Sequence, residues 1–352
     1  MALFALNNIA VRGIASCVPK TIIKNEDYPL FTPEDALKFS EQTGVYQKRE
    51  ADAHTTTADL CYHATEKLIA QLGWEKDSID VLIFVSQSPD YIYPASSCIL
   101  QHRLGLSINT AAMDISLGCS GWVYGFSTLA HFLSHGAMKR GLLLTGEITS
   151  KLGSKLDKSS YPLFGDAGTA TAVEFDPTAK TTYFHLQTDG EGYEAIIIPD
   201  GGCRNPTTEK SLVYEEIEEG IKLNRLHGRL NGMDVFAFGI LRAPQSVNKV
   251  LEYAAAQRED VDYYIFHQAN LFMNEKIRKK LKLTEEQVPY SLKDFGNTSS
   301  ASIPLTITTQ LLEKLQNKTT KIIACGFGVG LSWGTILFDL DKNFILCDLI
   351  EI

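Results

Sequence analysis

The feature of the sequence that most constrains its fold is an approximate internal repeat. The runs Ile79–Val85 and Val261–His267 each begin with an aliphatic residue and an aspartate, and they continue with apolar residues. Short, fully apolar runs are typical of strands in a sheet that helices cover on both faces. One such match carries little weight, because buried strands resemble one another.

A second pair of matching segments follows in the same order. Gly168-Thr169 opens an apolar run that ends at Asp176, and Gly334-Thr335 opens one that ends at Asp339. Two matches in one order predict two similar halves. We expect 1–178 to form the N-terminal half and 179–352 the C-terminal half, because a proline-containing break interrupts the pattern there.

Helical patterns lie between these predicted strands, at 58–72, 247–256 and 305–315. Strands that alternate with helices predict an α/β architecture with helix-covered sheets. The segment 184–234 has no clear period, so we expect an insertion of loops with room for one short helix. Its acidic run, 215–219, is interpreted as a solvated face.

Composition narrows the function further. The 352 residues carry a net charge of −9 and contain no basic run, which argues against a nucleic-acid partner. Seven scattered cysteines favour a reducing compartment over a disulfide framework. The sequence has no zinc-ligand spacing, secretion signal or 18-residue apolar stretch, so we expect no metal and no membrane span, and a cytoplasmic location.

Cys119 is the first candidate for chemistry. It follows a segment that can end a strand and precedes apolar residues at helical spacing. A cysteine at a helix N-terminus is exposed to unpaired N–H groups and the macrodipole, which favour its thiolate. Gly118 and Gly121 permit close approach of a substrate carbonyl. The alternative is a buried cysteine packed beside two glycines.

Three further segments carry chemical signals. His267 closes the second repeat strand where the first has Val85, and ligands of open α/β sheets bind at strand carboxyl ends. Asn297 lies in the run Gly296 to Pro304, which is rich in small residues. The alternative interpretation of this run is a plain turn followed by an N-capped helix, without a chemical role. The glycine-rich run 326–334 lacks the lysine of a phosphate-binding loop. It could bring its backbone close to a substrate oxygen, and the alternative is a tight turn between two strands.

Together, Cys119, the HQAN run 267–270, the GNTSSAS run 296–302 and the glycine-rich run in this order resemble the β-ketoacyl-acyl-carrier-protein synthase III family. The resemblance extends over nearly the whole chain. It implies the thiolase fold, in which two similar α/β halves form a layered αβαβα arrangement, and a homodimer. It also implies an acyltransferase of fatty-acid or lipid metabolism that condenses an acyl thioester with malonyl-acyl-carrier protein.

The resemblance also implies residue roles. Cys119 would carry the acyl group, and the N–H groups of Cys119 and Gly330 would form the oxyanion hole. His267 and Asn297 would donate hydrogen bonds to the malonyl thioester oxygen while CO₂ leaves. Neither a cofactor nor a metal is required.

Residues expected to bind substrate or carrier partly depart from the family pattern. Asn270 and Lys158 keep a family-like residue, and Tyr93 before Pro94 matches the aromatic that reaches the neighbouring subunit's pocket. Lys38 and Gln42 stand where the family has the tryptophan and arginine that hold coenzyme A, and Phe272 stands where it has a carrier-binding arginine. We therefore expect a donor other than short-chain acyl-coenzyme A, with a housekeeping fatty-acid initiator as the alternative.

Two other functions remain open from the sequence. One is acyl transfer from a thioester to an oxygen or nitrogen nucleophile without loss of CO₂. The other is a non-catalytic subunit that shapes the pocket of a partner enzyme, although such a subunit usually lacks the nucleophile that Cys119 supplies.

Overall fold

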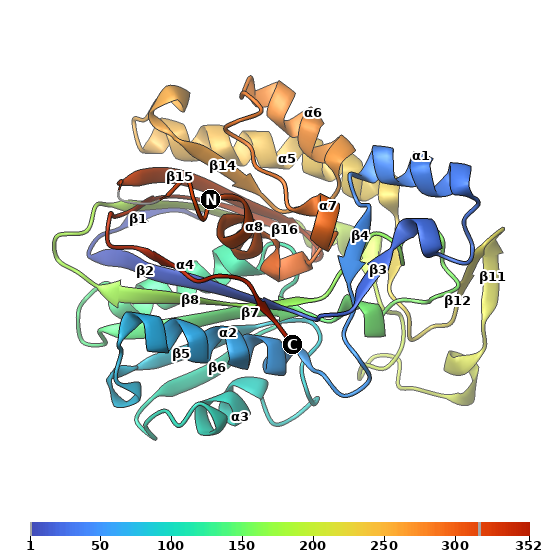
Figure 1. Ribbon diagram of the computed structural model, residues 1–352, viewed down its shortest axis with the longest axis horizontal. Coiled ribbons are helices and arrows are strands. Elements are labelled where there is room, and N and C mark those ends of the chain that lie inside the picture. The colour runs from blue at the N-terminus through green and yellow to red at the C-terminus, as the bar shows by residue number, and fades with distance from the viewer. Residues whose placement is uncertain (1, 316–317) are drawn as a thin grey trace.

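The computed structural model, which describes residues 2–315 and 318–352, has five layers (Figure 1). Two sheets lie face to face with two helices between them, and further helices cover both outer faces. The predicted layered αβαβα arrangement is therefore confirmed.

The two sheets repeat one strand pattern. The larger has the order β17-β2-β8-β7-β5-β6 and the smaller β1-β9-β16-β15-β14. In both, an antiparallel trio (β2-β8-β7 and β9-β16-β15) is extended by a parallel strand, β5 or β14. The first pair of predicted repeat strands is β5 and β14, which occupy equivalent positions in the two sheets. The repeat in the sequence therefore corresponds to a repeat of strand order.

The strands of the larger sheet are β2 (Ile9–Val18), β5 (Val81–Val85), β6 (Ala111–Ile115), β7 (Arg140–Glu147), β8 (Ala167–Phe175), β17 (Ile345–Leu346) and β18 (Ile350–Glu351). Those of the smaller sheet are β1 (Ala2–Leu6), β9 (Thr182–Thr188), β14 (Tyr263–Phe266), β15 (Thr320–Gly328) and β16 (Ser332–Leu340). Short two-stranded ribbons are formed by β3 (Ile22–Lys24) with β4 (Gln47–Arg49), β10 (Ile196–Ile197) with β13 (Arg229–Leu230), and β11 (Glu215–Glu218) with β12 (Ile221–Leu223).

The α-helices are α1 (Pro33–Thr43), α2 (Thr57–Leu72), α3 (Ser96–Arg103), α4 (Gly121–Leu133), α5 (Gly232–Tyr253), α6 (Leu271–Leu281), α7 (Leu292–Phe295) and α8 (Ser302–Gln310). Helices α4 and α8 form the middle layer and contact both sheets. Trp122, Phe126 and Leu129 of α4 are fully buried there. Helices α2 and α3 cover the outer face of the larger sheet, and α5 packs on the smaller.

Strands from the two chain ends join the sheet of the opposite half. β1 pairs antiparallel with β9 of the C-terminal half, whereas β17 and β18 pair parallel with β2 of the N-terminal half. Arg12 of β2 adds an ionic contact, because its guanidinium lies 2.9 Å from the carboxylate of Asp341. The two halves are therefore joined by backbone pairing as well as by the middle layer.

Several sequence-based boundaries were wrong. The helix predicted at 247–256 is the end of α5, which starts at Gly232 and contains Pro244. The helix predicted at 305–315 is α8, which starts at Ser302 and ends at Gln310. The segment 184–234 is not loops alone, since it holds four short strands, and its acidic run forms the exposed strand β11. Gly168 and Gly334 lie inside β8 and β16 and do not open them.

Of the helices within the described residues, none combines the length and apolarity that crossing a lipid bilayer requires.

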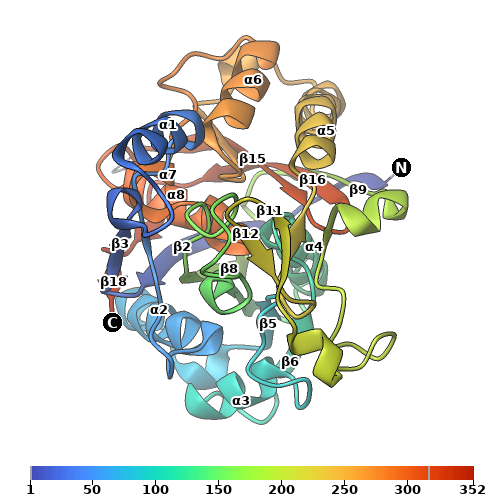
Figure 2. The same cartoon turned by 90° about the vertical axis from the view of Figure 1, so that its right-hand side faces the viewer.

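Gly168 is expected to be indispensable for the packing of α2 on the larger sheet (Figure 2). A Cβ there would lie 2.6 Å from the backbone nitrogen of Cys61 and from Cβ of Leu60. Gly168→Ala should therefore lower the free energy of unfolding by about 2 kcal/mol. Urea denaturation measures this, with Gly202→Ala as the control because a Cβ at Gly202 meets nothing within 4 Å. Equal effects of the two substitutions would contradict the prediction.

Candidate active site

The candidate site is built from the ends of strands in both sheets. Cys119 lies between the end of β6 and the start of α4, and His267 directly follows β14. Glu147 is the last residue of β7, and the glycine-rich run forms the hairpin between β15 and β16. Asn297 follows α7 and forms an isolated bridge with Phe164. Residues distant in sequence thus meet at one edge of the sheets.

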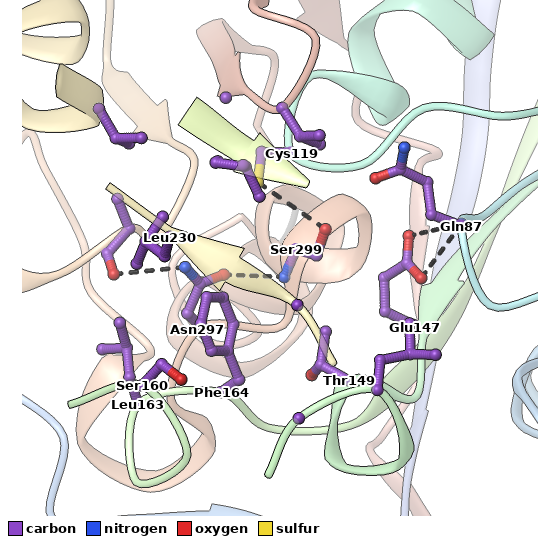
Figure 3. A pocket seen from close by; sticks show the side chains of 18 of the residues that line it. Gln87, Cys119, Glu147, Thr149, Ser160, Leu163, Phe164, Leu230, Asn297 and Ser299 are labelled. Carbon is purple, nitrogen blue, oxygen red and sulfur yellow. Dashed lines mark hydrogen bonds between the residues drawn. The ribbon is translucent and has the colours of Figure 1, made fainter. Parts of the chain in front are cut away.

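These residues line one pocket of about 470 Å³. Cys119, His267, Asn270 and Asn297, all predicted site residues, lie in it together. Much of its wall is apolar, from Leu152, Leu163, Phe164, Ile196, Ile197, Ile198, Leu230, Val235, Met273 and Phe327. The pocket therefore suits an aliphatic group that is bound at the sulfur of Cys119 (Figure 3).

The glycine-rich hairpin presses directly on Cys119. A Cβ on Gly328 would lie 2.8 Å from Sγ of Cys119, so no side chain fits there. The backbone N–H groups of Val329 and of Cys119 itself act to lower the pKa of the thiol. Gly330, which the sequence suggested as the second oxyanion donor, is absent from the pocket lining among the described residues. Val329 is therefore a further candidate for the second oxyanion donor, and the role of Gly330 stays a prediction.

Burial raises the pKa of the Cys119 thiol above its ordinary value. The Ser299 hydroxyl, 3.8 Å from Sγ, and the backbone of Val329 act in the opposite direction without cancelling it. The sequence-based expectation that helix α4 favours the thiolate is therefore not met in the resting protein. The thiol is neutral until a substrate and a proton acceptor reach it.

His267 is held by a hydroxyl relay. Nδ1 lies 2.8 Å from Oγ of Ser302, and the Ser302 hydroxyl donates to the Ser299 carbonyl at 2.7 Å. Because that hydroxyl has one proton and a carbonyl only accepts, Nδ1 is the donor to Ser302. Burial lowers the pKa of His267 to about 3, so the ring is neutral and Nε2 is an acceptor. The expected donor role of His267 therefore requires a proton that Nε2 takes up during the reaction.

Asn297 presents an N–H group to the pocket. Its Oδ1 accepts from the backbone N–H of Ser299 at 3.0 Å, which fixes the orientation of the amide. One Nδ2 hydrogen points to the carbonyl of Ala269 at 3.4 Å, and the second has no partner within the described part of the chain and can meet a ligand. Asn297 therefore fits the donor role that the sequence suggested.

The other predicted binding residues lie outside the lining of this pocket. Tyr93 is 85% exposed in the loop after β5, and Phe272 is exposed at the start of α6, where it stacks on Phe236. Lys38 and Gln42 are exposed on α1, which packs on α6. Lys158 packs against Gly220.

Sequence reasoning missed several polar residues of the pocket wall, among them Gln87, Ser116, Glu147 and Thr149. Glu147 is 1% exposed and accepts hydrogen bonds from the N–H of Gln87 and from the hydroxyls of Ser86 and Ser88. A single glutamate at the end of a strand has no characteristic spacing to other residues that would identify it from the sequence. Only the pairing of β5 with β7 brings these residues together.

Comparison with known proteins agrees with this geometry. The family models for 3-oxoacyl-(acyl-carrier-protein) synthase III and for its C-terminal part match residues 113–190 and 251–340. A β-ketoacyl-(acyl-carrier-protein) synthase III of Geobacillus kaustophilus is 32% identical over 92% of this chain and 96% of its own. A second, of Clostridium acetobutylicum, is 30% identical over 96% of this chain and 100% of its own.

A solved structure extends the agreement to three dimensions. The 3-oxoacyl-(acyl-carrier protein) synthase of Burkholderia xenovorans is 37% identical, with a TM-score of 0.93 over 99% of both chains. The fold and the site define a condensing enzyme of the thiolase type. The chain belongs to the β-ketoacyl-acyl-carrier-protein synthase III family.

The buried Glu147 should make stability depend on pH. Burial raises its pKa to about 8, above the ordinary value of an unfolded glutamate. The folded protein thus keeps a proton that the unfolded chain releases, and the free energy of unfolding should fall as pH rises from about 4.5 to 8. Glu147→Gln should remove this contribution, by up to roughly 1.4 kcal/mol per pH unit.

Urea denaturation at several pH values between about 5 and about 8 measures the slope for each protein. The exposed Glu41→Gln, which removes one carboxylate from α1, is the control. A slope that is the same in wild type and Glu147→Gln would show that Glu147 is ionised in the folded protein.

Proposed function

We propose that this protein catalyses decarboxylative Claisen condensation of an acyl thioester with malonyl-acyl-carrier protein, through an acyl-Cys119 intermediate. The observation that carries the proposal is the convergence of Cys119, His267 and Asn297 on one largely apolar pocket. The presence of all three weighs against a non-catalytic subunit. The N–H that Asn297 presents weighs against simple acyl transfer, which has no enolate to stabilise.

In the first half-reaction Cys119 attacks the acyl carbonyl and the carrier thiolate leaves. The N–H groups of Cys119 and Val329 face the sulfur and stabilise the oxyanion of the tetrahedral intermediate. His267 takes the thiol proton at Nε2, the nitrogen that its bond to Ser302 leaves free. The departing thiolate takes its proton from water.

In the second half-reaction the malonyl unit loses CO₂ and becomes an enolate. The free N–H of Asn297 donates to the enolate oxygen, and His267 donates the proton it holds at Nε2. The malonyl carboxylate supplies the negative charge that favours a charged His267. The carbanion attacks acyl-Cys119, and the expelled thiolate recovers its proton from His267, which completes the cycle.

Further assignments belong to the same proposal. The enzyme is an acyltransferase that works with an acyl-carrier protein in the cytoplasm, without a cofactor. The chain divides near residue 178, between β8 and β9. Asn270 and Lys158 contribute to substrate binding, and Gln42, Lys38 and Phe272 set the preference among acyl donors.

Acylation and decarboxylation can be measured separately to test the mechanism. Intact mass should show an acyl adduct on Cys119 that Cys119→Ala loses entirely. Asn297→Asp keeps the acceptor for Ser299 but loses the N–H, so CO₂ release should fall about 10²–10³-fold. Self-acylation of this variant should stay within about threefold of wild type, because one donor is aimed at the enolate only. An adduct on another cysteine, or equal loss of both steps, would contradict the mechanism.

The active form is expected to be a homodimer. Tyr91, Ile92 and Tyr93 are exposed on one loop, and Ile108 is 96% exposed in the same half. Apolar side chains gathered in this way favour burial in an interface. Light scattering should give about twice 39.0 kDa. Tyr93→Asp should weaken the dimer and lower activity together, whereas Tyr193→Asp, at another exposed tyrosine, should change neither. A fully active monomer would contradict this.

The acyl donor is expected not to be acetyl-coenzyme A. Lys38 and Gln42 offer neither an aromatic face nor a planar guanidinium to an adenine nucleotide, and stacking of this kind is worth roughly 1–3 kcal/mol. Acyl-carrier protein should therefore acylate Cys119 faster than the same acyl group on coenzyme A. Lys38→Trp with Gln42→Arg should raise the rate with coenzyme A alone. Faster reaction of wild type with acetyl-coenzyme A would support the housekeeping alternative.

A further inference from the structure

One wall of the pocket beside Cys119 is polar, although most of the pocket is apolar. It consists of Gln87, Ser116 and Glu147. Oε1 of Gln87 lies 2.7 Å from the position that a Cβ on Gly118 would take, and Ser116 precedes Cys119 by three residues. Gln87 and Glu147 therefore lie beside Cys119, at the thioester end of the pocket (Figure 3).

The polar wall has unused hydrogen-bonding capacity. Within residues 2–315 and 318–352, the side-chain amide of Gln87 and the hydroxyl of Ser116 make no hydrogen bond. Oε2 of Glu147 accepts from the hydroxyls of Ser86 and Ser88 at 3.2 and 2.9 Å. Oε1 meets only the N–H of Gln87, at 3.0 Å, within the same residues. Glu147 thus orients the backbone of Gln87, and Oε1 retains capacity for a second hydrogen bond.

An alkyl acyl group would fit this wall poorly. It would displace water from the amide and the hydroxyl and give no hydrogen bond in return, which is unfavourable. An acyl group with its own donor or acceptor near the thioester would restore those bonds. Sites built to hydrogen-bond a substrate group discriminate against analogues that lack it.

We propose that the wall formed by Gln87, Ser116 and Glu147 selects acyl groups that carry an uncharged hydroxyl or oxo group close to the thioester. The inference deepens the proposed function, on which it rests for the acyl-Cys119 intermediate. It assigns Gln87 and Ser116 as specificity-determining residues and Glu147 as the residue that positions Gln87.

Charge in the pocket argues for an uncharged substituent. Burial raises the pKa of Glu147 to about 8, so its carboxyl is protonated at neutral pH and does not attract an amine. Among the described lining residues, Arg229 is the one that carries a permanent positive charge. Its guanidinium lies 3.8 Å from the carboxylate of Glu215. The polar wall itself contains no cation that would pair with a carboxylate.

Matched thioesters test the proposal. Butyryl, 3-hydroxybutyryl and 4-hydroxybutyryl groups, each on pantetheine, share one carrier and one chain length. Intact mass over time gives the rate at which each acylates Cys119. One of the two hydroxylated groups should react about five- to tenfold faster than butyryl, the effect of one net hydrogen bond. Wild-type protein that acylates equally fast with all three, or fastest with butyryl, would overturn the proposal.

Substitutions assign the preference to the wall. Gln87→Leu and Ser116→Ala should each bring the rate ratio toward one, mainly by accelerating butyryl. Gln71→Leu, the same change at an exposed glutamine of α2 outside the pocket lining, should keep the wild-type ratio. If Gln87→Leu fails to fold, Ser116→Ala alone decides. A ratio that stays at the wild-type value in the folded variants would overturn the assignment.

Failure of the proposed function would look different. In that case Cys119 would show the same preference among the three thioesters, but a malonyl thioester added to the acylated protein would release no CO₂. Release of CO₂ without a preference for a hydroxylated group would instead leave the condensation in place and reject the role of the wall.

Discussion

The structure depends on the burial of α4 and α8 between two sheets. Both helices contact strands of each sheet, and Trp122 and Phe126 of α4 have no exposed surface. Since α4 is packed on both sides, its first turn and the preceding Cys119 have a fixed position at the junction of the halves. α8 likewise fixes the Asn297 loop that leads into it. The β15–β16 hairpin then closes on Cys119 through Gly328. The middle layer thus turns a repeat of strands into a site with contributions from both halves.

Burial at this junction also sets the charge of the site. It raises the pKa of Cys119 and of Glu147 and lowers that of His267 to about 3, so all three are neutral at pH 7. In the resting site, the groups placed to stabilise an oxyanion or enolate are therefore oriented dipoles, and we propose the N–H groups of Cys119, Val329 and Asn297 for this role. Such dipoles need little reorganisation because the backbone and Ser299 hold them in place.

The sequence was sufficient for features that depend on local pattern. Strands β5 and β14 are apolar runs, and the position of Cys119 between β6 and α4 follows from the change of period around it. The start of α5 was missed because Pro244 and the loops before Gly232 disguise the helical pattern. Gly330 was named as an oxyanion donor from the family resemblance. In the structure the close contact with Cys119 is at Gly328, and the backbone of the next residue, Val329, acts on the thiol.

Glu147 shows what no local pattern reveals. Its chemistry arises from strand pairing, since β7 runs parallel beside β5 and places the carboxyl under the loop that follows Val85. Ser86, Gln87 and Ser88 of this loop bind Glu147, and the same loop continues to the exposed Tyr93. One short segment therefore connects a buried acid at the nucleophile to an aromatic side chain on the surface. A contact of Tyr93 in the proposed dimer would bear on a loop whose other end forms the pocket wall, so the proposed assembly and the proposed acyl selection share one structural element.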